Sequence, residues 1–320
     1  MPTYRGIVIG CGKIAVRFEA DQKRPRPRSH AGALSEHSRT ELVAFVGKDD
    51  ADRAAAAEFF PHAAFYADAA ECIKAMKPDI AIIAASTGTH AAFTILCAEE
   101  GVPIIIGEKP VAHSIEDAHR IKGAIEKSGS TFVLNYQRRF FPLFLRARER
   151  IAAGALGSLR EIVCLYDNGL FNNGGHAIDT VEFLLGERMV SATGVVNEGN
   201  TTHPEGDPNI EGTILTENGT KISLQSFDRN VAPIHELRLY GEKGELHIRD
   251  FGYTFDWGTD VERESISMTA GALEEAIRAY EEKREPASGI GNGIETLSVL
   301  EALKASAAHG GAETPVAVYF

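Results

Sequence analysis

The sequence contains few cysteines and no arrangement of them that is typical of a metal site. Four occur in 320 residues, Cys11, Cys72, Cys97 and Cys164, and none belongs to a Cys-x-x-Cys pair. Secreted proteins that depend on disulfides are much richer in cysteine. We therefore expect reduced thiols in a cytoplasmic protein, and no metal.

Long apolar runs are missing as well. The densest one, Ile80–Ser86, is far shorter than the roughly 20 residues needed to span a bilayer. The short apolar segment that follows Met1–Arg5 and ends at Gly10 lacks the cleavage pattern of a secretory signal. These absences predict a protein with neither a membrane span nor an export signal.

Positive charge is in the minority. The chain has 33 Lys and Arg against 45 Asp and Glu, which gives a net charge of −12 at pH 7. Because an acidic surface repels phosphate backbones, we expect no nucleic-acid partner. The composition, 44% hydrophobic and 24% charged, is that of a globular protein long enough for two domains.

Residues 1–135 alternate short apolar segments with longer alanine-rich ones. The expected strands are Arg5–Ile9, Glu41–Val46, Asp79–Ala85, Val102–Ile106 and Thr131–Asn135. The expected helices between them include Ala51–Phe59, Thr89–Glu100 and Ser114–Ser128. Continuous apolar strands separated by helices predict an α/β domain with a doubly wound parallel sheet that is covered on both faces.

The pattern changes in residues 136–320. The expected strands are Leu159–Tyr166, Glu211–Leu215, Lys221–Phe227, Glu236–Tyr240 and Glu245–Arg249, and the expected helices are Leu143–Ala153, Ala177–Leu185 and Glu295–Ala308. The turn sequences Glu217–Gly219 and Glu242–Gly244 are typical of hairpins. This part predicts a second α/β domain with a mainly antiparallel sheet.

A glycine-rich turn follows the first expected strand. In Gly10-Cys11-Gly12-Lys13-Ile14-Ala15, Gly10 permits a tight turn, Gly12 lets a pyrophosphate approach the backbone, and Ala15 allows close helix packing. A tight strand-to-helix turn needs glycine whether or not anything binds there. Its position after the first strand of an alternating domain favours a dinucleotide site that also opens a helix.

The end of the second expected strand bears on the choice of cofactor. It runs into Gly47-Lys48-Asp49, and a small residue followed by a cation suits a 2′-phosphate, which favours NADP(H) over NAD(H). The alternative is that Lys48 is a solvated loop lysine and Asp49 meets the ribose. The prediction is therefore NAD(P), with a preference for NADP(H).

A lysine follows the expected strand Val102–Ile106. Gly107-Glu108-Lys109-Pro110 lies at the carboxyl end of a parallel strand, where side chains point into the ligand crevice. Lysine can polarise a hydroxyl or carbonyl oxygen and exchange a proton. Ser114 and Asp117 then form a capping box for the next helix. An isolated Lys-Pro pair is more often a plain loop than a catalytic site.

Several motifs in the same order together resemble the glucose-fructose oxidoreductase / inositol dehydrogenase family. They are Gly10–Ala15, Ser86–His90, Ala98–Gly101, Glu108–Pro110, Gly175–Asp179, Tyr240–Leu246 and Gly293–Leu297. The resemblance implies an amino-terminal Rossmann domain in residues 1–135. It also implies a carboxyl-terminal α/β domain in residues 136–320 with a large, mainly antiparallel open sheet, often used for homodimers or homotetramers. The implied activity is NAD(P)-dependent oxidation or reduction of sugars and cyclitols.

The resemblance assigns roles to individual residues. Lys109 matches the catalytic lysine of the Glu-Lys-Pro motif, and His176 matches the histidine of a D-x-x-x-H motif whose aspartate falls on Asn172. Because an asparagine cannot transfer a proton at neutral pH, we expect Lys109 and His176 to be catalytic and Asn172 to orient substrate. The implied cofactor contacts are Gly10, Gly12, Lys13, Ile14, Ala15, Gly47, Lys48, Ser86, Thr87, His90, Glu108 and Lys109.

Three further substrate contacts follow from the same resemblance, each with a structural alternative. Arg139 lies in a segment that flanks the family's substrate cleft, or it is an ion-pair partner. Tyr166 opens a segment, Tyr166–His176, that resembles a branch associated with surface-polysaccharide and nucleotide-sugar pathways. Asp179 contacts substrate, or it complements a helix dipole. The basic stretch Arg17–Ser29 resembles an insertion and is expected to be an extended, positively charged loop that holds a phosphate or is solvated.

The sequence thus predicts an NAD(P)-dependent sugar dehydrogenase or reductase that acts on CH–OH groups of a sugar, cyclitol or nucleotide sugar. Hydride would pass between nicotinamide and a carbinol carbon, with Lys109 polarising the oxygen and His176 exchanging its proton. Two alternatives remain. One is a glycosidase that keeps its NAD bound and uses transient oxidation. The other is a non-catalytic regulator that senses a dinucleotide.

Overall fold

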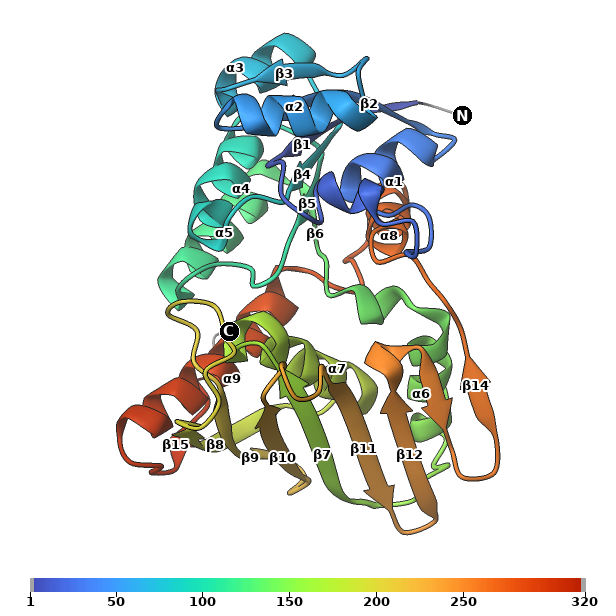
Figure 1. Cartoon of the computed structure of the whole chain (residues 1–320), viewed down its shortest axis with the longest axis vertical. Helices are drawn as coiled ribbons and strands as arrows, with labels where there is room; N and C mark the ends of the chain where they lie inside the picture. Colours follow the sequence, from blue (N-terminus) through green and yellow to red (C-terminus); the bar gives the residue numbers. More distant parts are fainter. Residues whose placement is uncertain (1–2, 318–320) are drawn as a thin grey trace. The chain divides into compact units, whose positions relative to one another are not determined.

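The computed structural model describes residues 3–317 and divides the chain into two compact units (Figure 1). Unit 1 consists of Met1–Phe140 and Ile266–Gly293, and unit 2 of Phe141–Ser265 and Ile294–Phe320. Within the described residues, no helix is long and apolar enough to cross a membrane. No group of three or more His, Cys, Asp or Glu side chains in this part of the chain could hold a metal ion.

Unit 1 is built on a parallel sheet of six strands. Its strands are β1 (Tyr4–Ile9), β2 (Thr40–Val46), β3 (Ala64–Tyr66), β4 (Ile80–Ile83), β5 (Ile104–Gly107) and β6 (Thr131–Leu134). Their spatial order is β3-β2-β1-β4-β5-β6, and every neighbouring pair is parallel. The chain order reverses between β1 and β4, which makes the carboxyl edge there a switch point for ligands. The predicted doubly wound sheet is confirmed.

Helices cover both faces of this sheet (Figure 1). The helices of unit 1 are α1 (His30–Glu36), α2 (Asp50–Phe59), α3 (Ala69–Met76), α4 (His90–Glu99), α5 (Ile115–Ser128) and α8 (Ala270–Glu282). α3, α4 and α5 pack side by side in one layer, and α1 packs against α8 in the other. Ser114 caps α5 by accepting a hydrogen bond from the Asp117 N–H at 3.1 Å, as its sequence predicts.

The boundary between the units differs from the one drawn on the sequence at residues 135 and 136. Residues 266–293, assigned there to the second domain, return to unit 1 and form α8. Leu273 and Ile277 of α8 are buried in the same core as Val8 of β1 and Ile82 of β4. A helix that closes an uncovered face of a sheet joins that sheet's core, however far it lies along the chain.

An insertion splits the first helix of unit 1. The carbonyls of Ile14 and Ala15 accept hydrogen bonds from the N–H groups of His30 and Ala31, at 3.0 Å each. In an unbroken helix those donors would come from four residues along. The glycine turn therefore opens only a turn and the 3-10 helix η1 (Arg17–Ala20), and the helix resumes as α1. The helix expected to open at the glycine turn is thus interrupted after one short helical segment, and the expected insertion before His30 agrees with this geometry.

The basic loop of the insertion carries its own counter-charges. Arg24 pairs with Asp21 at 3.2 Å and stacks on the Phe18 ring at 3.7 Å. Arg26 donates to Glu36 at 2.7 Å. Arg24 and Arg26 are thus engaged within unit 1, which favours the structural alternative for this loop over phosphate binding.

Unit 2 contains a sheet of nine strands. They are β7 (Leu159–Asp167), β8 (Met189–Val196), β9 (Ile210–Thr216), β10 (Lys221–Phe227), β11 (His235–Gly241), β12 (Gly244–Arg249), β13 (Thr254–Asp256), β14 (Val261–Arg263) and β15 (Thr314–Pro315). Their order is β14-β13-β12-β11-β7-β10-β9-β8-β15. Among the described strands of this sheet only the β7–β10 pair is parallel, and both predicted hairpins, β9–β10 and β11–β12, are present. The large, mainly antiparallel sheet is confirmed.

One face of this sheet is covered by helices and the other is open. The helices of unit 2 are α6 (Pro142–Ala152), α7 (Gly175–Leu185) and α9 (Ile290–Ala308), of which the first residues belong to unit 1. Phe144 of α6 meets Phe255 edge to face at 4.7 Å, and Ser306 of α9 accepts a hydrogen bond from the Gly194 N–H. Strand residues alternate between this buried face and the open one.

Candidate active site

The glycine turn lies at the carboxyl end of β1 with space over its second glycine. Gly10 has φ +108°, and a Cβ there would lie 2.5 Å from the Ala84 carbonyl oxygen, so only glycine fits. Gly12 is exposed, and nothing lies within 4 Å of where its Cβ would stand. A flat, open backbone segment of this kind fits the approach of a dinucleotide pyrophosphate. Lys13 is exposed beside it, whereas Ala15 is fully buried against the sheet.

The next ligand-facing position, at the end of β2, has no room for an acidic side chain. A Cβ on Gly47 would lie 2.7 Å from the Phe65 ring and 2.8 Å from the Cβ of Asp52. Asp49 uses one carboxylate oxygen to cap α2 through the Asp52 N–H. The Lys48 side chain is 83% exposed, with its ammonium 3.9 Å from the other Asp49 oxygen. Lys48, the residue suited to a 2′-phosphate, and Asp49, the residue suited to the ribose hydroxyls, are thus both present at this edge.

Arg17 of the insertion reaches the same end of the sheet. Its Nε donates to the Cys11 carbonyl at 2.9 Å, and its guanidinium pairs with Asp52 at 3.3 Å. Cys11 itself is buried, and burial raises the pKa of its thiol to about 12, so it stays neutral. The other three cysteines are likewise buried free thiols.

The end of β4 corrects one predicted cofactor contact. Ser86 is exposed and Thr87 is half-buried, so both present atoms at the carboxyl edge. His90 is instead buried, with Nδ1 2.9 Å from the Pro110 carbonyl oxygen and Nε2 3.2 Å from that of Ala85. Both ring nitrogens face the backbone of unit 1, so His90 ties two loops together and its ring has no nitrogen left for a cofactor.

At the end of β5, Glu108 and Lys109 point to different environments. Glu108 is buried, and its Oε1 accepts hydrogen bonds from His30 Nε2 and Asn135 Nδ2, each at 2.7 Å. Lys109 is half-buried, at the carboxyl edge that also carries the glycine turn. Glu108 therefore makes its hydrogen bonds inside unit 1, whereas Lys109 is the residue able to face a ligand.

Arg139 lies in the 3-10 helix η3 (Gln137–Phe140), directly after β6. Its side chain is buried, at 6% exposure. A guanidinium buried to this extent fits the structural alternative better than the predicted contact with substrate.

In unit 2, Asn172 and His176 lie on a short π-helical segment, η4 (Leu170–Gly174), and on the start of α7. The N–H groups of Phe171 and Asn172 donate to the two carboxylate oxygens of Asp207, at 2.8 and 2.9 Å. Asn209 accepts a hydrogen bond from the Gly169 N–H at 2.9 Å. Two side chains from the loop before β9 thus fix the start of the segment that carries Asn172 and His176.

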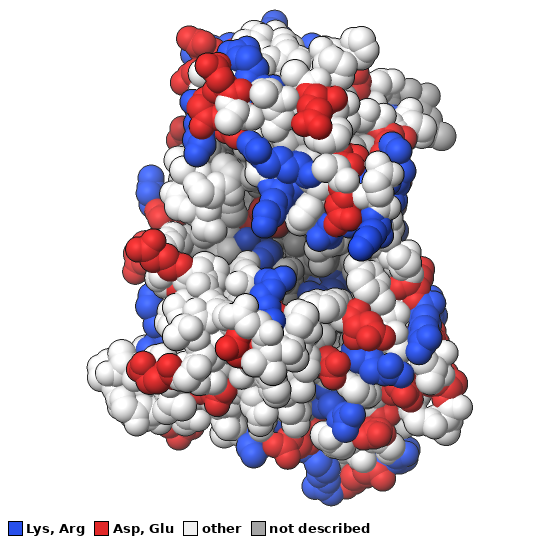
Figure 2. Space-filling view, in the orientation of Figure 1, with Lys and Arg blue, Asp and Glu red and all other residues white. Residues whose placement is uncertain are grey.

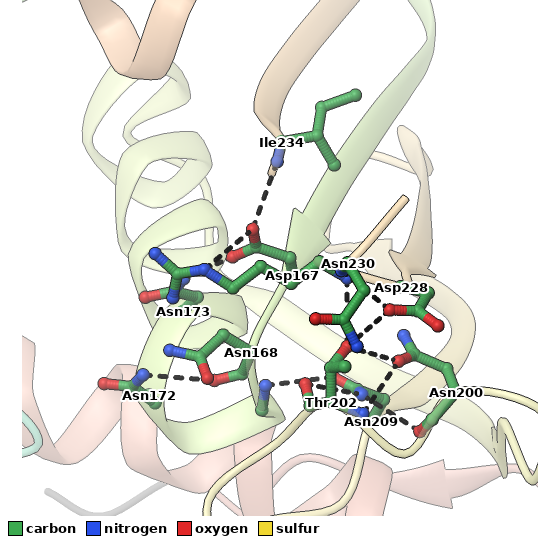
Figure 3. A network of polar contacts seen from close by, with 12 residues as sticks. Asp167, Asn168, Asn172, Asn173, Asn200, Thr202, Asn209, Asp228, Asn230 and Ile234 are labelled. Carbon is green, nitrogen blue, oxygen red and sulfur yellow. Dashed lines mark hydrogen bonds and ion pairs between the residues drawn. The ribbon is translucent and has the colours of Figure 1, made fainter. Parts of the chain in front are cut away.

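A buried carboxylate anchors the other end of this segment (Figure 3). Asp167 is fully buried at the end of β7 and accepts hydrogen bonds from Asn173 Nδ2 at 2.7 Å and from the Ile234 N–H at 3.1 Å. His235, the residue after Ile234, meets the His176 ring edge to face, with centroids 6.3 Å apart. Asp167 thereby fixes the backbone close to His176 and His235.

Two predicted substrate contacts lie in the core of unit 2. Tyr166 is fully buried, and its hydroxyl both donates to the Ile210 carbonyl and accepts from the Ile210 N–H, at 2.8 Å each. Asp179 is 1% exposed and lies in the second turn of α7, which begins at Gly175. Neither position offers a ligand an exposed atom, and the second turn is too far from the helix start for a dipole role.

The residues that position the site were not singled out from the sequence. His30, Asn135, Asp207 and Asp167 each bond a residue far away in the chain. Asp167 lies within the segment Tyr166–His176, but no role was predicted for any of the four. The only available signal was their place near the ends of expected strands or beside a recognised motif. Pairings between such distant residues follow from the fold alone.

The fold and the carboxyl edge of the parallel sheet of unit 1 define a class of protein, an α/β oxidoreductase with a dinucleotide-binding unit. Residues 5–136 match the family described as "Oxidoreductase family, NAD-binding Rossmann fold". Inositol 2-dehydrogenase 2 of Saccharopolyspora erythraea is 27% identical over 257 residues, which are 75% of this chain and 72% of that protein. These matches confirm the resemblance: the chain is similar to members of the glucose-fructose oxidoreductase / inositol dehydrogenase family, and its residues 5–136 match the NAD-binding model of that family.

Solved structures share the whole fold at low identity. The aldose-aldose oxidoreductase of Caulobacter crescentus has a TM-score of 0.82 at 19% identity, covering 98% of this chain and 99% of that one. The WlbA dehydrogenase of Bordetella pertussis, solved with NADH and UDP-GlcNAcA, has a TM-score of 0.83 at 18% identity, covering 99% of each chain. The protein is an NAD(P)-dependent oxidoreductase.

Proposed function

We propose that this protein transfers hydride between NAD(P) and a carbinol or carbonyl carbon of a sugar, cyclitol or nucleotide sugar. The observation that carries the proposal is the position of Lys109. It follows β5 at the carboxyl edge of the same sheet whose first strand ends in the open turn at Gly12. The named relatives support the substrate class, since they include an inositol dehydrogenase and an aldose oxidoreductase.

The residues of the chain then have distinct tasks. When bound, the nicotinamide supplies or accepts the hydride. Lys109 donates a hydrogen bond from its ammonium to the substrate oxygen, which draws electron density from the reacting C–O bond. His176 accepts the hydroxyl proton during oxidation and returns it during reduction. Asn172, which cannot exchange a proton, holds a neighbouring hydroxyl in place.

For the cofactor, we propose a preference for NADP(H). Gly47 leaves no room for the acidic side chain that would bond both ribose hydroxyls, and the exposed Lys48 stands at the position suited to a 2′-phosphate. Asp49 argues in the opposite direction, but one of its oxygens is already engaged as the cap of α2.

We further propose that two copies associate through the open face of the unit 2 sheet, as a homodimer or within a homotetramer, in the cytoplasm. That face carries Val163, Leu165, Leu215, Phe227 and Tyr240, of which the last three are 36–37% exposed. A broad, partly apolar sheet face without covering helices is a surface that a second copy can bury. Over unit 2, at the bottom of Figure 2, acidic and basic side chains are interspersed rather than separated by sign.

The deciding experiment is a turnover screen of the purified protein with NADPH, NADH and their oxidised forms. The panel contains myo-inositol, free aldoses, methyl glucosides and UDP-sugars, each followed by nicotinamide absorbance. Turnover of added cofactor with one of these substrates supports a dehydrogenase or reductase. Cleavage of a glycoside without net turnover of added cofactor would favour the glycosidase alternative, and cofactor binding without any reaction the regulator.

A further inference from the structure

A buried carboxylate adjoins the proposed catalytic lysine. Glu108 is 9% exposed, and two donors converge on its Oε1, His30 Nε2 and Asn135 Nδ2, each at 2.7 Å. The amide group of Asn135 also faces the Met268 carbonyl at 3.4 Å, so two acceptors fix its NH2 side toward Glu108. Each donor comes from a different part of unit 1, namely the start of α1 and the residue after β6.

The contacts keep this carboxylate ionised. Burial alone would raise the pKa of Glu108, but the hydrogen bond and charge of His30, the Asn135 amide and the positive charge of Lys109 together lower it below its usual value. An electrostatic interaction between two groups acts on both of them. The negative charge that benefits from Lys109 therefore also favours the ammonium form of Lys109.

The segment around Lys109 is anchored on both sides. The Glu108 N–H donates to the Ile83 carbonyl at 3.0 Å, and the Pro110 carbonyl faces His90 Nδ1 at 2.9 Å. His90 is itself buried, at 3% exposure. With both of its neighbours fixed to the interior of unit 1, the backbone of Lys109 has little freedom to move.

We propose that Glu108 is a positioning residue that, through its contacts with His30 and Asn135, fixes the place of Lys109 and holds its amino group in the charged, hydrogen-bond-donating form. The proposal rests on the proposed role of Lys109 in catalysis. It adds to that role a reason why the amine stays an acid at neutral pH. His30 and Asn135 then act on the site although they lie on α1 and beyond β6.

The test is a titration of Lys109 that needs neither substrate nor cofactor. The protein is labelled with trace acetic anhydride over a range of pH, and acetylation of each lysine is quantified by peptide mass spectrometry. In Glu108→Gln, the pKa of Lys109 should fall by about one unit, because the neighbouring negative charge is gone. The exposed Lys127 of α5 serves as the internal reference and should not change.

The matched control is Glu116→Gln, which removes the charge of an exposed carboxylate on α5 of the same unit. It should leave the pKa of Lys109 unchanged. An unchanged Lys109 in folded Glu108→Gln, or an equal shift in Glu116→Gln, overturns the proposal. If Glu108→Gln does not fold, the parent protein decides. A Lys109 pKa at or above that of Lys127 supports the proposal, and a lower one refutes it.

A shorter side chain separates charge from position. Glu108→Asp keeps the charge but lacks one methylene group of reach toward His30 and Asn135. We expect the pKa of Lys109 to stay close to the parent value while turnover falls. A drop in the pKa as large as that of Glu108→Gln would contradict the role of charge. The labelling result is independent of turnover, so a failure of Lys109 as the catalytic residue would show separately, as parental turnover in Lys109→Ala.

Discussion

At the residue scale, Gly12 gives the clearest test of the cofactor site. The space over its Cα is open, so Gly12→Val fits the folded unit while its methyl groups occupy the approach of a pyrophosphate. We expect binding of both NADH and NADPH to weaken at least about tenfold, or about 1.4 kcal/mol. Fluorescence titration measures this, with circular dichroism to check the fold.

The control for this substitution is Gly123→Val on α5, where a Cβ also meets open space but no ligand edge is near. It should bind both cofactors as the parent does. Parental affinity in folded Gly12→Val would mean that the dinucleotide does not pass over this turn.

Lys48 tests the choice between the two cofactors. Because its ammonium is exposed beside Gly47, Lys48→Asp should repel a 2′-phosphate and weaken NADPH about tenfold, while NADH is spared or improved. The same titration measures both, and Lys127→Asp is the control for a charge change elsewhere on unit 1. Equal affinity of the parent for NADH and NADPH would remove the basis of the preference.

Lys109 tests the chemistry. Lys109→Ala removes the donor to the substrate oxygen, so kcat should fall by a factor of about 100 or more, with cofactor affinity nearly intact because the pyrophosphate end is untouched. Steady-state kinetics on the substrate found by the screen measure it. Retention of the parental kcat would exclude this residue from the reaction.

Asn172 provides the contrast at the same scale. Asn172→Ala should cause a smaller loss that appears mainly in KM, since an amide that orients substrate acts on binding. Asn172→Ala also removes the hydrogen bond from the Asn172 side chain to the Asn168 carbonyl at 3.1 Å. The segment should nevertheless keep its shape, because the backbone N–H of residue 172 still donates to Asp207. If Asn172→Asp instead raised kcat well above the parent, the natural protein would be attenuated, which favours the regulator alternative.

At the element scale, α8 depends on a buried carboxylate whose charge varies with pH. Burial would raise the pKa of Glu275, but hydrogen bonds from Arg284, the Ala287 N–H and Arg278 lower it to about 2. The side chain is only 3% exposed. Two of its partners, Arg284 and Ala287, follow α8 in the chain, so the Glu275 carboxylate fixes the residues after α8 to that helix.

The sign of the pH effect follows from the lowered pKa. A carboxyl group that titrates lower in the folded state stabilises it fully above its unfolded pKa, about 4.3, and loses that contribution as pH falls toward 2. Glu275→Gln should destabilise unit 1 by up to about 3 kcal/mol at neutral pH and flatten the decline between pH 5 and pH 2, as measured by urea unfolding. The same acid dependence in parent and variant would contradict this assignment.

At the scale of the whole molecule, the open face of the unit 2 sheet predicts self-association. Leu215→Lys places a charge on that face, on β9, and should shift the protein toward monomer in light scattering coupled to size-exclusion chromatography. Val231→Lys changes an exposed valine in the loop between β10 and β11, outside the strands of the sheet, and should leave the assembly intact. A monomeric parent would exclude the proposed interface at the concentrations tested.

The sequence by itself determined the elements whose pattern is local. The inner parallel strands of unit 1 could be predicted because they form unbroken apolar runs buried on both faces, as Ile80–Ile83 does, whereas the half-buried edge strand β3 was not predicted. The capping residue Ser114 and the two hairpins follow from turn and cap chemistry that acts over a few residues. The glycine turn belongs here too, because Gly10 needs its positive φ whatever the rest of the chain does.

Only the tertiary structure decided which distant residues meet. No local rule joins α8 to a sheet that ends more than a hundred residues earlier, or makes the helix begun at Ile14 resume at His30. The same holds for side chains: His90 and Tyr166 have residue types suited to ligands, yet their polar atoms are taken by backbone groups, among them those of Pro110 and Ile210 in other elements of the fold. Burial and hydrogen bonding depend on the packed neighbours of a residue, and those neighbours are set by the fold rather than by sequence spacing.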